Sequence, residues 1–370
     1  MIVARMRVLF LVPSLGGGGA ERVFSTLLRH LDRNRFELHL AVLQGGGAYM
    51  GDVPKDVTIH DLRVSRARYA LPSVLNLVWR LRPQAMLSTP LNLNLTLILG
   101  KPLLPSGTKL LVRESTTASV FLGETKNPKM WTWLYRKLYK KADKIVCLSD
   151  WIVDDMVAKL GVPREKMVRI YNPVDINRVL ELAEVGGNPY SGPGPHLVAA
   201  GRLSREKGFD ILLAAMPAVL ECLPDSRLTI LGDGPLRDDL SNQMHKLGLS
   251  PVVNFLGFQQ NPWRYLKHAD AFVLPSRYEG LSNILLEVLA IGRPVVATDC
   301  PGAVREVESC DEEMIVVRPE DHVALAEAIV SVCRRPRREH DHLETVRLRM
   351  SKFNLQRIVD EYSALFQQVS

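Results

Sequence analysis

Residues 271–287 read AFVLPSRYEGLSNILLE, which combines a short apolar strand, a polar loop and the beginning of a helix. The apolar run covers residues 271–274, and Ser282 or Asn283 can cap the helix that follows. In a parallel sheet, such a unit places the first turn of the helix at the carboxyl edge of the strands. Unpaired N–H groups and the helix dipole attract anions there. The stretch therefore indicates a parallel α/β fold with a site for an anionic ligand.

The same stretch carries two carboxylates. Glu279 lies in the expected loop and Glu287 in the second turn of the expected helix, so they reach different parts of one elongated ligand. Carboxylates accept hydrogen bonds from hydroxyl groups, in which sugars and riboses are rich. The alternative is a surface loop with solvated carboxylates. For Glu287 taken alone we expect this exposed position, because charged residues are mostly exposed.

Two further strands end in similar chemistry. Residues 196–200 lead into GRLSREKG, which contains Arg202 and Lys207, and residues 227–231 lead into GDGP at 232–235. The planar fork of Arg202 and the point charge of Lys207 suit phosphate oxygens and would stabilise a departing diphosphate without a metal. Taken alone, each turn is an ordinary connection between a strand and a helix. Three such turns at one sheet edge predict a nucleotide-sugar site.

The N-terminal half contains its own glycine-rich turn. A buried-strand run at 7–12 is followed by Gly16 to Gly19 and then by an apolar helical pattern. This is not the dinucleotide fingerprint, because Glu21 or Arg22 stands where the third glycine is required. The run permits close approach of the backbone to a polar ligand.

Over nearly its whole length the chain resembles the retaining, GT-B fold glycosyltransferases of glycosyltransferase family 4. The resemblance rests on motifs spread along the sequence and on the E-x7-E spacing of Glu279 and Glu287. The other motifs are GGAE at 18–21, YNPVD at 171–175, GRL at 201–203 with KG at 207–208, and GDGP at 232–235.

The resemblance implies two Rossmann-like, doubly wound α/β domains that face an interdomain cleft. It implies that Glu279 contacts the transferred sugar and that Arg202 and Lys207 bind the donor diphosphate, so these three are the catalytic candidates. Glu287 would contact the ribose and Phe258 the nucleobase. The remaining donor-binding candidates are Gly18, Gly19, Gly201, Gly232, Gly280, Leu281, Ser282 and Asn283.

The acceptor side departs from the family pattern. Many members carry a histidine after the fourth strand of the first domain, whereas residues 111–116 of this chain read LVREST. Arg113 and Glu114 are the candidates for that position, with Glu21 as a third acceptor-side candidate. Glu114 has two interpretations: it contacts the acceptor, or it is an ion-pair partner of Arg113.

Chain length and strand pattern predict two domains. A chain of 370 residues exceeds the size at which a single core keeps growing. Strands expected near 7–12, 37–43, 85–89, 109–113, 144–148 and 168–171 alternate with helical patterns, and a second series begins at 196. We predict an acceptor-side domain at 1–185, a Gly- and Pro-rich linker at 186–195 and a donor-binding domain at 196–353. By resemblance, a helix at 354–370 completes the first domain.

Basic charge is concentrated in the first part of the chain. Residues 1–144 hold 22 Lys or Arg against 9 Asp or Glu, although the whole chain has a net charge of only +7. Within them, the segment 126–144 combines tryptophans, tyrosines and lysines. Such a helix either lies at an anionic lipid surface or is an ordinary amphipathic helix whose Trp and Leu side chains face the core. Nucleic acid is not an expected partner, because its binding motifs are absent.

Other sequence features bound the location and the chemistry. No apolar run reaches the ~18–20 residues of a membrane span. The five cysteines form no C-x-x-C pair, which fits reduced thiols, and no signal-peptide pattern opens the chain. We therefore expect a cytoplasmic protein, at most peripheral at the inner face of the cell membrane. His340-Asp341-His342 is flanked by arginines that would repel a cation, so we expect neither a metal nor another cofactor.

The predicted function is transfer of a hexose or an N-acetylhexosamine from a nucleoside diphosphate sugar, expected to be uridine-linked, with retention of configuration. The acceptor would be a lipid-linked sugar or a polysaccharide in cell-surface polysaccharide or glycolipid biosynthesis. Two alternatives remain: a nucleotide-sugar epimerase of the same fold, which converts the donor alone, and a non-catalytic protein that binds nucleotide sugars or membranes.

Overall fold

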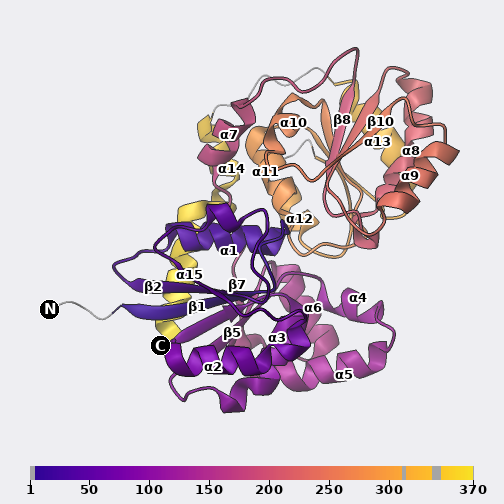
Figure 1. The fold of residues 1–370 in the computed structure, drawn as a ribbon. Coiled ribbons are helices and arrows are strands. Elements are labelled where there is room, and N and C mark those ends of the chain that lie inside the picture. Colours follow the sequence, from indigo (N-terminus) through magenta and orange to yellow (C-terminus); the bar gives the residue numbers. More distant parts are fainter. Residues whose placement is uncertain (1–4, 311–313, 336–342, 370) are drawn as a thin grey trace. The chain divides into compact units, whose positions relative to one another are not determined.

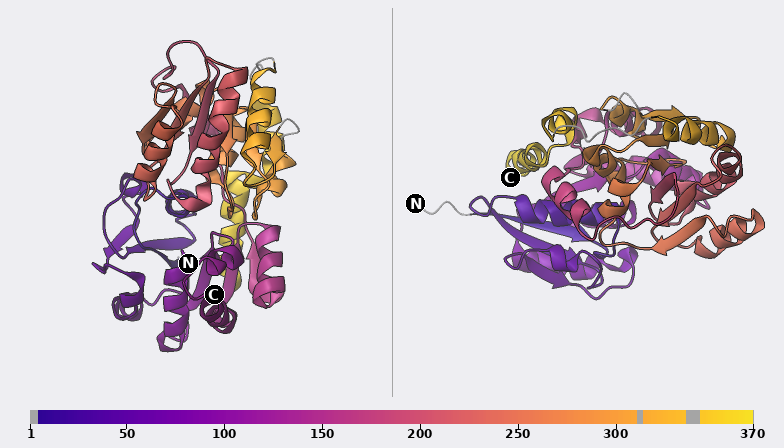
Figure 2. Two further views of the ribbon diagram at one scale, coloured as in Figure 1. Left: turned by 90° about the vertical axis from the view of Figure 1, so that its right-hand side faces the viewer. Right: turned by 90° about the horizontal axis from the view of Figure 1, so that it is seen from above.

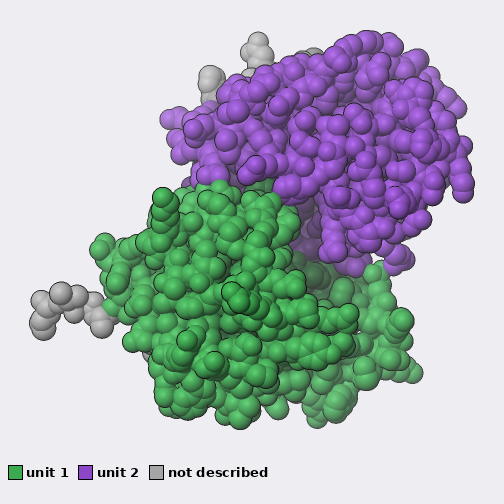
Figure 3. Space-filling view, in the orientation of Figure 1, with its two compact units in different colours: residues 1–173, 355–370 green, residues 174–354 purple. Residues whose placement is uncertain are grey.

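Strands and helices alternate along most of the computed structural model, which describes residues 5–310, 314–335 and 343–369. The chain divides into two units, shown in Figures 1 and 3. The first unit comprises residues 1–173 and 355–370, and the second comprises residues 174–354.

The first unit is built on one parallel sheet, with seven strands among its described residues. Their order is β3-β2-β1-β4-β5-β6-β7. The strands are β1 (Met6–Val12), β2 (Phe36–Val42), β3 (Thr58–Asp61), β4 (Ala85–Ser88), β5 (Lys109–Glu114), β6 (Lys144–Cys147) and β7 (Met167–Arg169).

Helices cover both faces of this sheet. Figures 1 and 2 show α1 (Gly19–His30) and α15 (Leu355–Val369) on one face, and α2 (Leu71–Leu81) and α3 (Leu91–Gly100) on the other. The remaining α-helices of the unit are α4 (Ala118–Gly123), α5 (Pro128–Leu138) and α6 (Asp150–Leu160).

The C-terminal helix α15 is part of the core of the first unit. Its Phe366 ring lies edge-on to Phe10 of β1 and Phe36 of β2, with 6.0 Å between ring centroids in each pair. All three rings are at most 1% exposed. Edge-to-face packing of buried rings contributes ~0.5–1.5 kcal/mol beyond burial itself. The last residues of the chain therefore stabilise the first strands.

The described residues of the second unit form a six-stranded parallel sheet, in the order β10-β9-β8-β11-β12-β13. The strands are β8 (His196–Ala200), β9 (Arg227–Leu231), β10 (Val253–Gly257), β11 (Ala271–Leu274), β12 (Val295–Thr298) and β13 (Ile315–Val317). On one face lie α8 (Phe209–Cys222), α9 (Arg237–Lys246) and α13 (His322–Cys333), whose apolar side chains share one core with the strands.

The opposite face carries α10 (Trp263–His268) and α11 (Asn283–Ile291), against which α7 (Ile176–Glu184) packs. The helices α12 (Val304–Glu308) and α14 (Leu343–Arg349) complete the unit. Because α7 packs on α10 and α11, the second unit begins at Val174. The sequence boundary after residue 185 and the linker 186–195 thus fall inside it.

These two parallel sheets confirm the predicted doubly wound α/β class. The edge strand β3 is absent from the predicted series, since three of its residues, Thr58, Ile59 and Asp61, are exposed and form no apolar run. In each sheet the strand order reverses once, between β1 and β4 and between β8 and β11. In open α/β sheets, ligands bind outside the carboxyl ends of the strands at such points.

Candidate active site

The reversal point of the second sheet brings together two residues that are far apart in the sequence. Lys207 follows β8 and Glu279 follows β11, and Nζ of Lys207 lies 2.5 Å from Oε1 of Glu279. The hydroxyl of Ser276 donates to the same oxygen at 2.8 Å. Glu279 is 8% exposed, whereas the Lys207 side chain is 20% exposed. The structure thus places two of the predicted catalytic residues in one ion pair.

The loop after β12 fixes the backbone around Glu279. The amide of Glu279 donates to the carbonyl of Pro301 at 3.0 Å, and the amide of Ala303 donates to the carbonyl of Gly280 at 3.0 Å. The hydroxyl of Thr298 donates to the carbonyl of Ser276. Backbone contacts from a third strand end therefore hold the carboxylate in place.

Two predicted motif glycines, Gly208 and Gly232, are required by packing. Gly208 is the N-cap of α8 with a φ of +64°, and a Cβ there would overlap the carbonyl of Pro275. Gly232 has a φ of +128°, and a Cβ there would overlap the carbonyl of Gly201. Since L side chains rarely adopt these backbone conformations, both turns need glycine before any ligand is considered. A Cβ at Gly201 would in turn lie 3.4 Å from the Lys207 stem.

Arg202, the third catalytic candidate, differs from Lys207. Its side chain is exposed, and within the described ranges its guanidinium has no hydrogen bond or ion pair. Exposed planar guanidinium groups bind phosphate oxygens through two parallel hydrogen bonds. The arrangement thus offers one paired and one unpaired cation at the end of β8.

Phe258, the nucleobase candidate, and Gly232 lie at the ends of the neighbouring strands β10 and β9. Phe258 is 45% exposed and directly follows Gly257, whose carbonyl accepts a 2.8 Å hydrogen bond from the amide of Gly232. An exposed aromatic ring beside a side-chain-free turn can stack on a flat base. These two predicted residues are therefore brought together.

Glu287 is buried, so our expectation of an exposed position is wrong. It is 6% exposed, and Nε1 of Trp263 on α10 donates to its Oε2 at 2.8 Å. The indole supplies the hydrogen bond that a buried carboxylate requires. The E-x7-E spacing identified Glu287, but nothing in the sequence identified Trp263.

The beginning of α11 carries the remaining donor candidates. Ser282 occupies the N-cap with extended backbone, and in this described segment its side chain makes no capping hydrogen bond. Leu281 and Ser282 are each 7% exposed, while Gly280 is buried and Asn283 is half-buried. Amides in the first turn of a helix lack partners within the helix and can bind an anion.

In the first unit, the predicted glycine turn leads into α1. Gly18 is the N-cap of α1 and Gly19 its first residue, and both are exposed. A Cβ at Gly18 would overlap the carboxylate of Glu21, so that carboxylate lies over the helix N-terminus. An acidic group there is favoured by the helix dipole. The structure thus places Glu21 at the position where we predicted backbone contacts to the donor.

Glu114 and Arg113, the two further acceptor-side candidates, are buried at the end of β5. Oε2 of Glu114 accepts hydrogen bonds from the hydroxyls of Tyr135 and Tyr139, both at 2.9 Å. Burial raises the pKa of Glu114 to about 7, although hydrogen bonds from Tyr139 and Tyr135 act in the opposite direction. Arg113 instead donates to Oδ1 of Asn172 at 2.5 Å.

Among the described residues, Glu114 and Arg113 make no direct ion pair, although the charge of Arg113 acts to lower the pKa of Glu114. Glu114 is 0% exposed, and its carboxylate accepts hydrogen bonds from two tyrosines that the sequence analysis did not single out. Their i,i+4 spacing on one helical face was the available signal. Contact of Glu114 with an acceptor stays a prediction.

The basic aromatic segment forms α5 and the short helix at Tyr139–Lys141. Tyr135 and Leu138 face the core, whereas Met130 and Trp133 are 51% and 59% exposed. The helix is amphipathic, but a tryptophan lies on its outer face among lysines. Across the residues that the structure describes, none of the helices is long and apolar enough to cross a membrane.

The described ranges contain no group of three or more His, Cys, Asp or Glu side chains placed to hold a metal ion. His340, Asp341 and His342 lie outside the described residues. That the reaction needs no metal stays a prediction.

Comparisons with known proteins agree with the two-unit architecture. A family model described as "Glycosyl transferase 4-like domain" matches residues 18–173, and one described as "Glycosyl transferases group 1" matches residues 194–335. A similar curated protein is the N-acetylgalactosamine-N,N'-diacetylbacillosaminyl-diphospho-undecaprenol 4-alpha-N-acetylgalactosaminyltransferase of Campylobacter jejuni. It is 29% identical over 86% of this chain and 87% of that protein. The lipopolysaccharide core biosynthesis glycosyltransferase LpsD of Rhizobium meliloti is 28% identical over 94% of this chain and 95% of that protein.

Solved structures match over nearly the whole chain. HepE of Anabaena, solved in complex with UDP and glucose, has a TM-score of 0.74 at 18% identity and covers 98% of this chain and 100% of its own. Sucrose-phosphate synthase of Thermosynechococcus elongatus has a TM-score of 0.77 at 17% identity, with 99% of each chain covered. The fold is therefore GT-B. The chain belongs to the glycosyltransferases, with a glycosyl transferase 4-like domain followed by a group 1 domain.

Proposed function

We propose that this protein transfers an N-acetylhexosamine or a hexose from a uridine diphosphate sugar to a lipid-linked or saccharide acceptor, with retention of configuration. The observation that carries the proposal is the meeting of Lys207 and Glu279 at the reversal point of the second sheet. A cation and a carboxylate there suit the two halves of the donor: the diphosphate binds the cation and the sugar hydroxyls bind the carboxylate.

Binding of the donor would separate this ion pair. Phosphate oxygens would then bind Lys207, together with the exposed Arg202 and the first-turn amides of α11. Glu279, still held by Ser276, is then able to accept hydrogen bonds from the transferred sugar. Charge that develops on the leaving diphosphate is stabilised without a metal. Glu287, positioned by Trp263, binds the ribose.

The acceptor proposal draws on the relatives. The name of the Campylobacter jejuni protein describes an α-linked N-acetylgalactosamine added to a diphospho-undecaprenol-linked sugar, and the Rhizobium meliloti protein acts in lipopolysaccharide core biosynthesis. HepE was solved with UDP, which favours a uridine nucleotide. We therefore place this protein in the cytoplasm at the inner face of the cell membrane, in cell-surface polysaccharide or glycolipid biosynthesis.

The outer face of α5 would contact the membrane. It combines exposed Met130 and Trp133 with cations, which suits the interface of an anionic bilayer. The exposed cations of this segment are Lys126, Lys129, Arg136, Lys137, Lys140 and Lys141.

The test is release of nucleoside diphosphate from a panel of nucleotide sugars by the purified protein, with and without bacterial lipid extract. Release that requires lipid, survives EDTA and is lost in Glu279→Ala and Arg202→Ala supports the proposal and identifies the donor. Glu221→Ala and Lys246→Ala are the matched controls, since both change exposed helical charges elsewhere in the second unit. Mass and NMR analysis of the product then gives the anomeric configuration.

Three outcomes contradict the proposal. Conversion of the donor without an acceptor indicates an epimerase or a hydrolase. Binding of the donor without turnover indicates a non-catalytic protein. A β-linked product from an α-linked donor excludes retention.

A further inference from the structure

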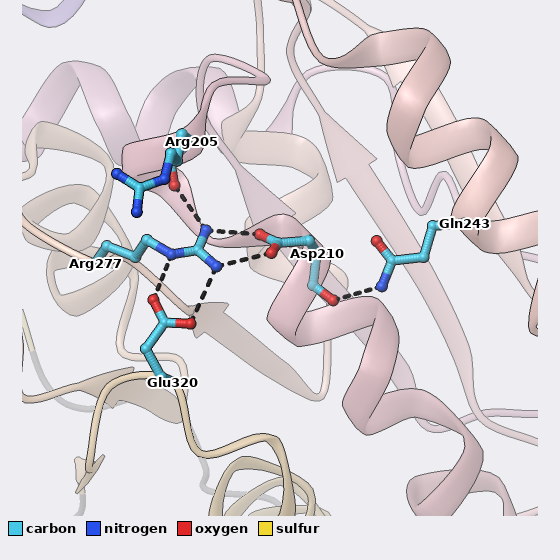
Figure 4. Close-up of polar contacts among 5 residues, drawn as sticks. All are labelled: Arg205, Asp210, Gln243, Arg277 and Glu320. Carbon is cyan, nitrogen blue, oxygen red and sulfur yellow. Dashed lines mark hydrogen bonds and ion pairs between the residues drawn. The ribbon is translucent and has the colours of Figure 1, made fainter. Parts of the chain in front are cut away.

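Arg277 binds the side chains of Asp210 and Glu320 and the backbone of Arg205, as Figure 4 shows. Its Nη1 and Nη2 donate to Oδ1 and Oδ2 of Asp210, both at 2.7 Å. Its Nε donates to Oε1 of Glu320, and Nη2 donates to Oε2 of the same carboxylate at 3.1 Å. Nη1 also donates to the carbonyl of Arg205 at 2.9 Å. One guanidinium thus links three parts of the second unit.

The backbone of Arg277 reinforces this link. Its amide donates to the carbonyl of Glu206 at 2.8 Å, directly before Lys207. In the sequence, Arg277 stands two residues before Glu279. The network is anchored to α9 as well, because Nε2 of Gln243 donates to the carbonyl of Asp210 at 2.8 Å. A single residue, Arg277, therefore connects the loop of Lys207 with the loop of Glu279.

All five N–H groups of the Arg277 guanidinium are occupied by these contacts. Its side chain is 14% exposed. A donor phosphate could bind it only by displacing one of its present partners. In this respect Arg277 is unlike Arg202, and its geometry indicates support rather than ligand binding.

The charges of the network are stable around neutral pH. Hydrogen bonds to Asp210, followed by those to Glu320, raise the pKa of Arg277 despite partial burial. Burial alone would raise the pKa of Asp210, but hydrogen bonds from Arg277 outweigh it and lower that pKa. The ion pair between Arg277 and Asp210 therefore persists near neutral pH.

We propose that Arg277 is a positioning residue that sets the distance between Lys207 and Glu279. This inference rests on the proposed function of that pair. A lysine cannot replace it, because an ammonium has no planar fork to bind two carboxylates and a carbonyl together. Misplacement of catalytic groups by ~1 Å can cost ~100-fold in rate.

The kinetic test compares Arg277→Lys with the wild type, using the donor and acceptor that the panel identifies. We expect kcat to fall by ~10–100-fold while KM for the donor changes by less than ~3-fold. Arg305→Lys is the matched control, since Arg305 also binds two acids, Asp299 and Glu308, in the same unit. Glu320→Gln disturbs the network from its far side and should reproduce part of the loss in kcat.

A second measurement needs no turnover. The coupling between Lys207→Met and Glu279→Gln in urea unfolding should shrink by at least half in the Arg277→Lys background, and stay unchanged in the Arg305→Lys background. An unchanged coupling overturns the positioning role even if the protein proves to be an enzyme. A reduced coupling together with no turnover of any donor supports the positioning role and contradicts the proposed function.

Two kinetic results also overturn the proposal. A donor KM that rises more than kcat falls makes Arg277 a donor ligand. An unchanged kcat per folded molecule makes it a purely structural residue.

Discussion

Glu279 and Glu114 both lie at the carboxyl end of a parallel strand, and both are buried, yet their partners differ in kind. Glu279 pairs with the ammonium of Lys207 and a serine hydroxyl, whereas Glu114 accepts from two tyrosine hydroxyls. Lys207 remains partly exposed, while Glu114, Tyr135 and Tyr139 are fully buried. Burial alone therefore does not identify a ligand site. The useful distinction is whether a partly exposed charge accompanies the buried one.

The largest expected effect tests this distinction through activity. Lys207→Met removes a cation that would stabilise the leaving diphosphate, so kcat should fall by ~100–1000-fold. Glu114→Gln keeps the shape of the tyrosine-bound side chain, and kcat should stay within ~10-fold of the wild type. Both are measured as nucleoside diphosphate release. A loss in Glu114→Gln as large as that in Lys207→Met would make Glu114 part of the reacting site.

Steric change in the second unit should have the next largest effect. In Gly208→Ala, the new Cβ overlaps the carbonyl of Pro275 and separates the loops of Lys207 and Glu279. We expect a loss of ~2–4 kcal/mol in the free energy of unfolding, since a left-handed conformation and a clash combine.

Gly161→Ala is the control for this substitution. Gly161 also has a left-handed φ, of +61°, but open space around its Cβ position. Its cost should therefore be only the conformational ~1–2 kcal/mol. Equal losses in urea unfolding would mean that the contact with Pro275 carries no energy.

The next largest effect is the contribution of Glu114 to the pH dependence of stability. Burial raises the pKa of Glu114 from 4.5 to about 7, so the folded state keeps a proton that the unfolded state releases. Stability therefore falls as pH rises, by about 2 kcal/mol through this group between pH ~5.5 and ~8.5. Glu114→Gln should remove that part of the slope. If its urea midpoints follow the wild type across the pH range, Glu114 does not titrate as inferred.

The smallest effect concerns the outer face of α5, whose inner face supplies Tyr135 to Glu114. Each cation near an anionic bilayer contributes ~1 kcal/mol, so Lys137→Ala should weaken binding to phosphatidylglycerol vesicles by ~5-fold at low salt. Lys246→Ala, an exposed lysine on α9, should have no effect. Vesicle co-sedimentation measures both. Equal losses in the two variants would indicate non-specific attraction of a basic protein.

Prediction from sequence succeeded where a residue's position depends on its own strand or motif. The apolar runs predicted the positions of β8, β9 and β11, and the E-x7-E spacing singled out Glu279 and Glu287 as candidate residues. It failed where a partner comes from elsewhere in the chain. Trp263, which binds Glu287, lies on another helix, and the position of α7 depends on packing against helices formed much later in the sequence. Arg277 was within the quoted stretch, but only the fold shows which acids it binds.

Gly232 leads to a consequence for how relatives of this protein diverge. Any side chain there would overlap the carbonyl of Gly201, so selection for folding alone is enough to retain glycine. A descendant that lost its substrate could keep this glycine unchanged while Lys207 and Glu279 drifted freely. Among related sequences, a retained glycine at this turn would therefore indicate common descent, whereas a retained Lys207–Glu279 pair would indicate that the chemistry is retained.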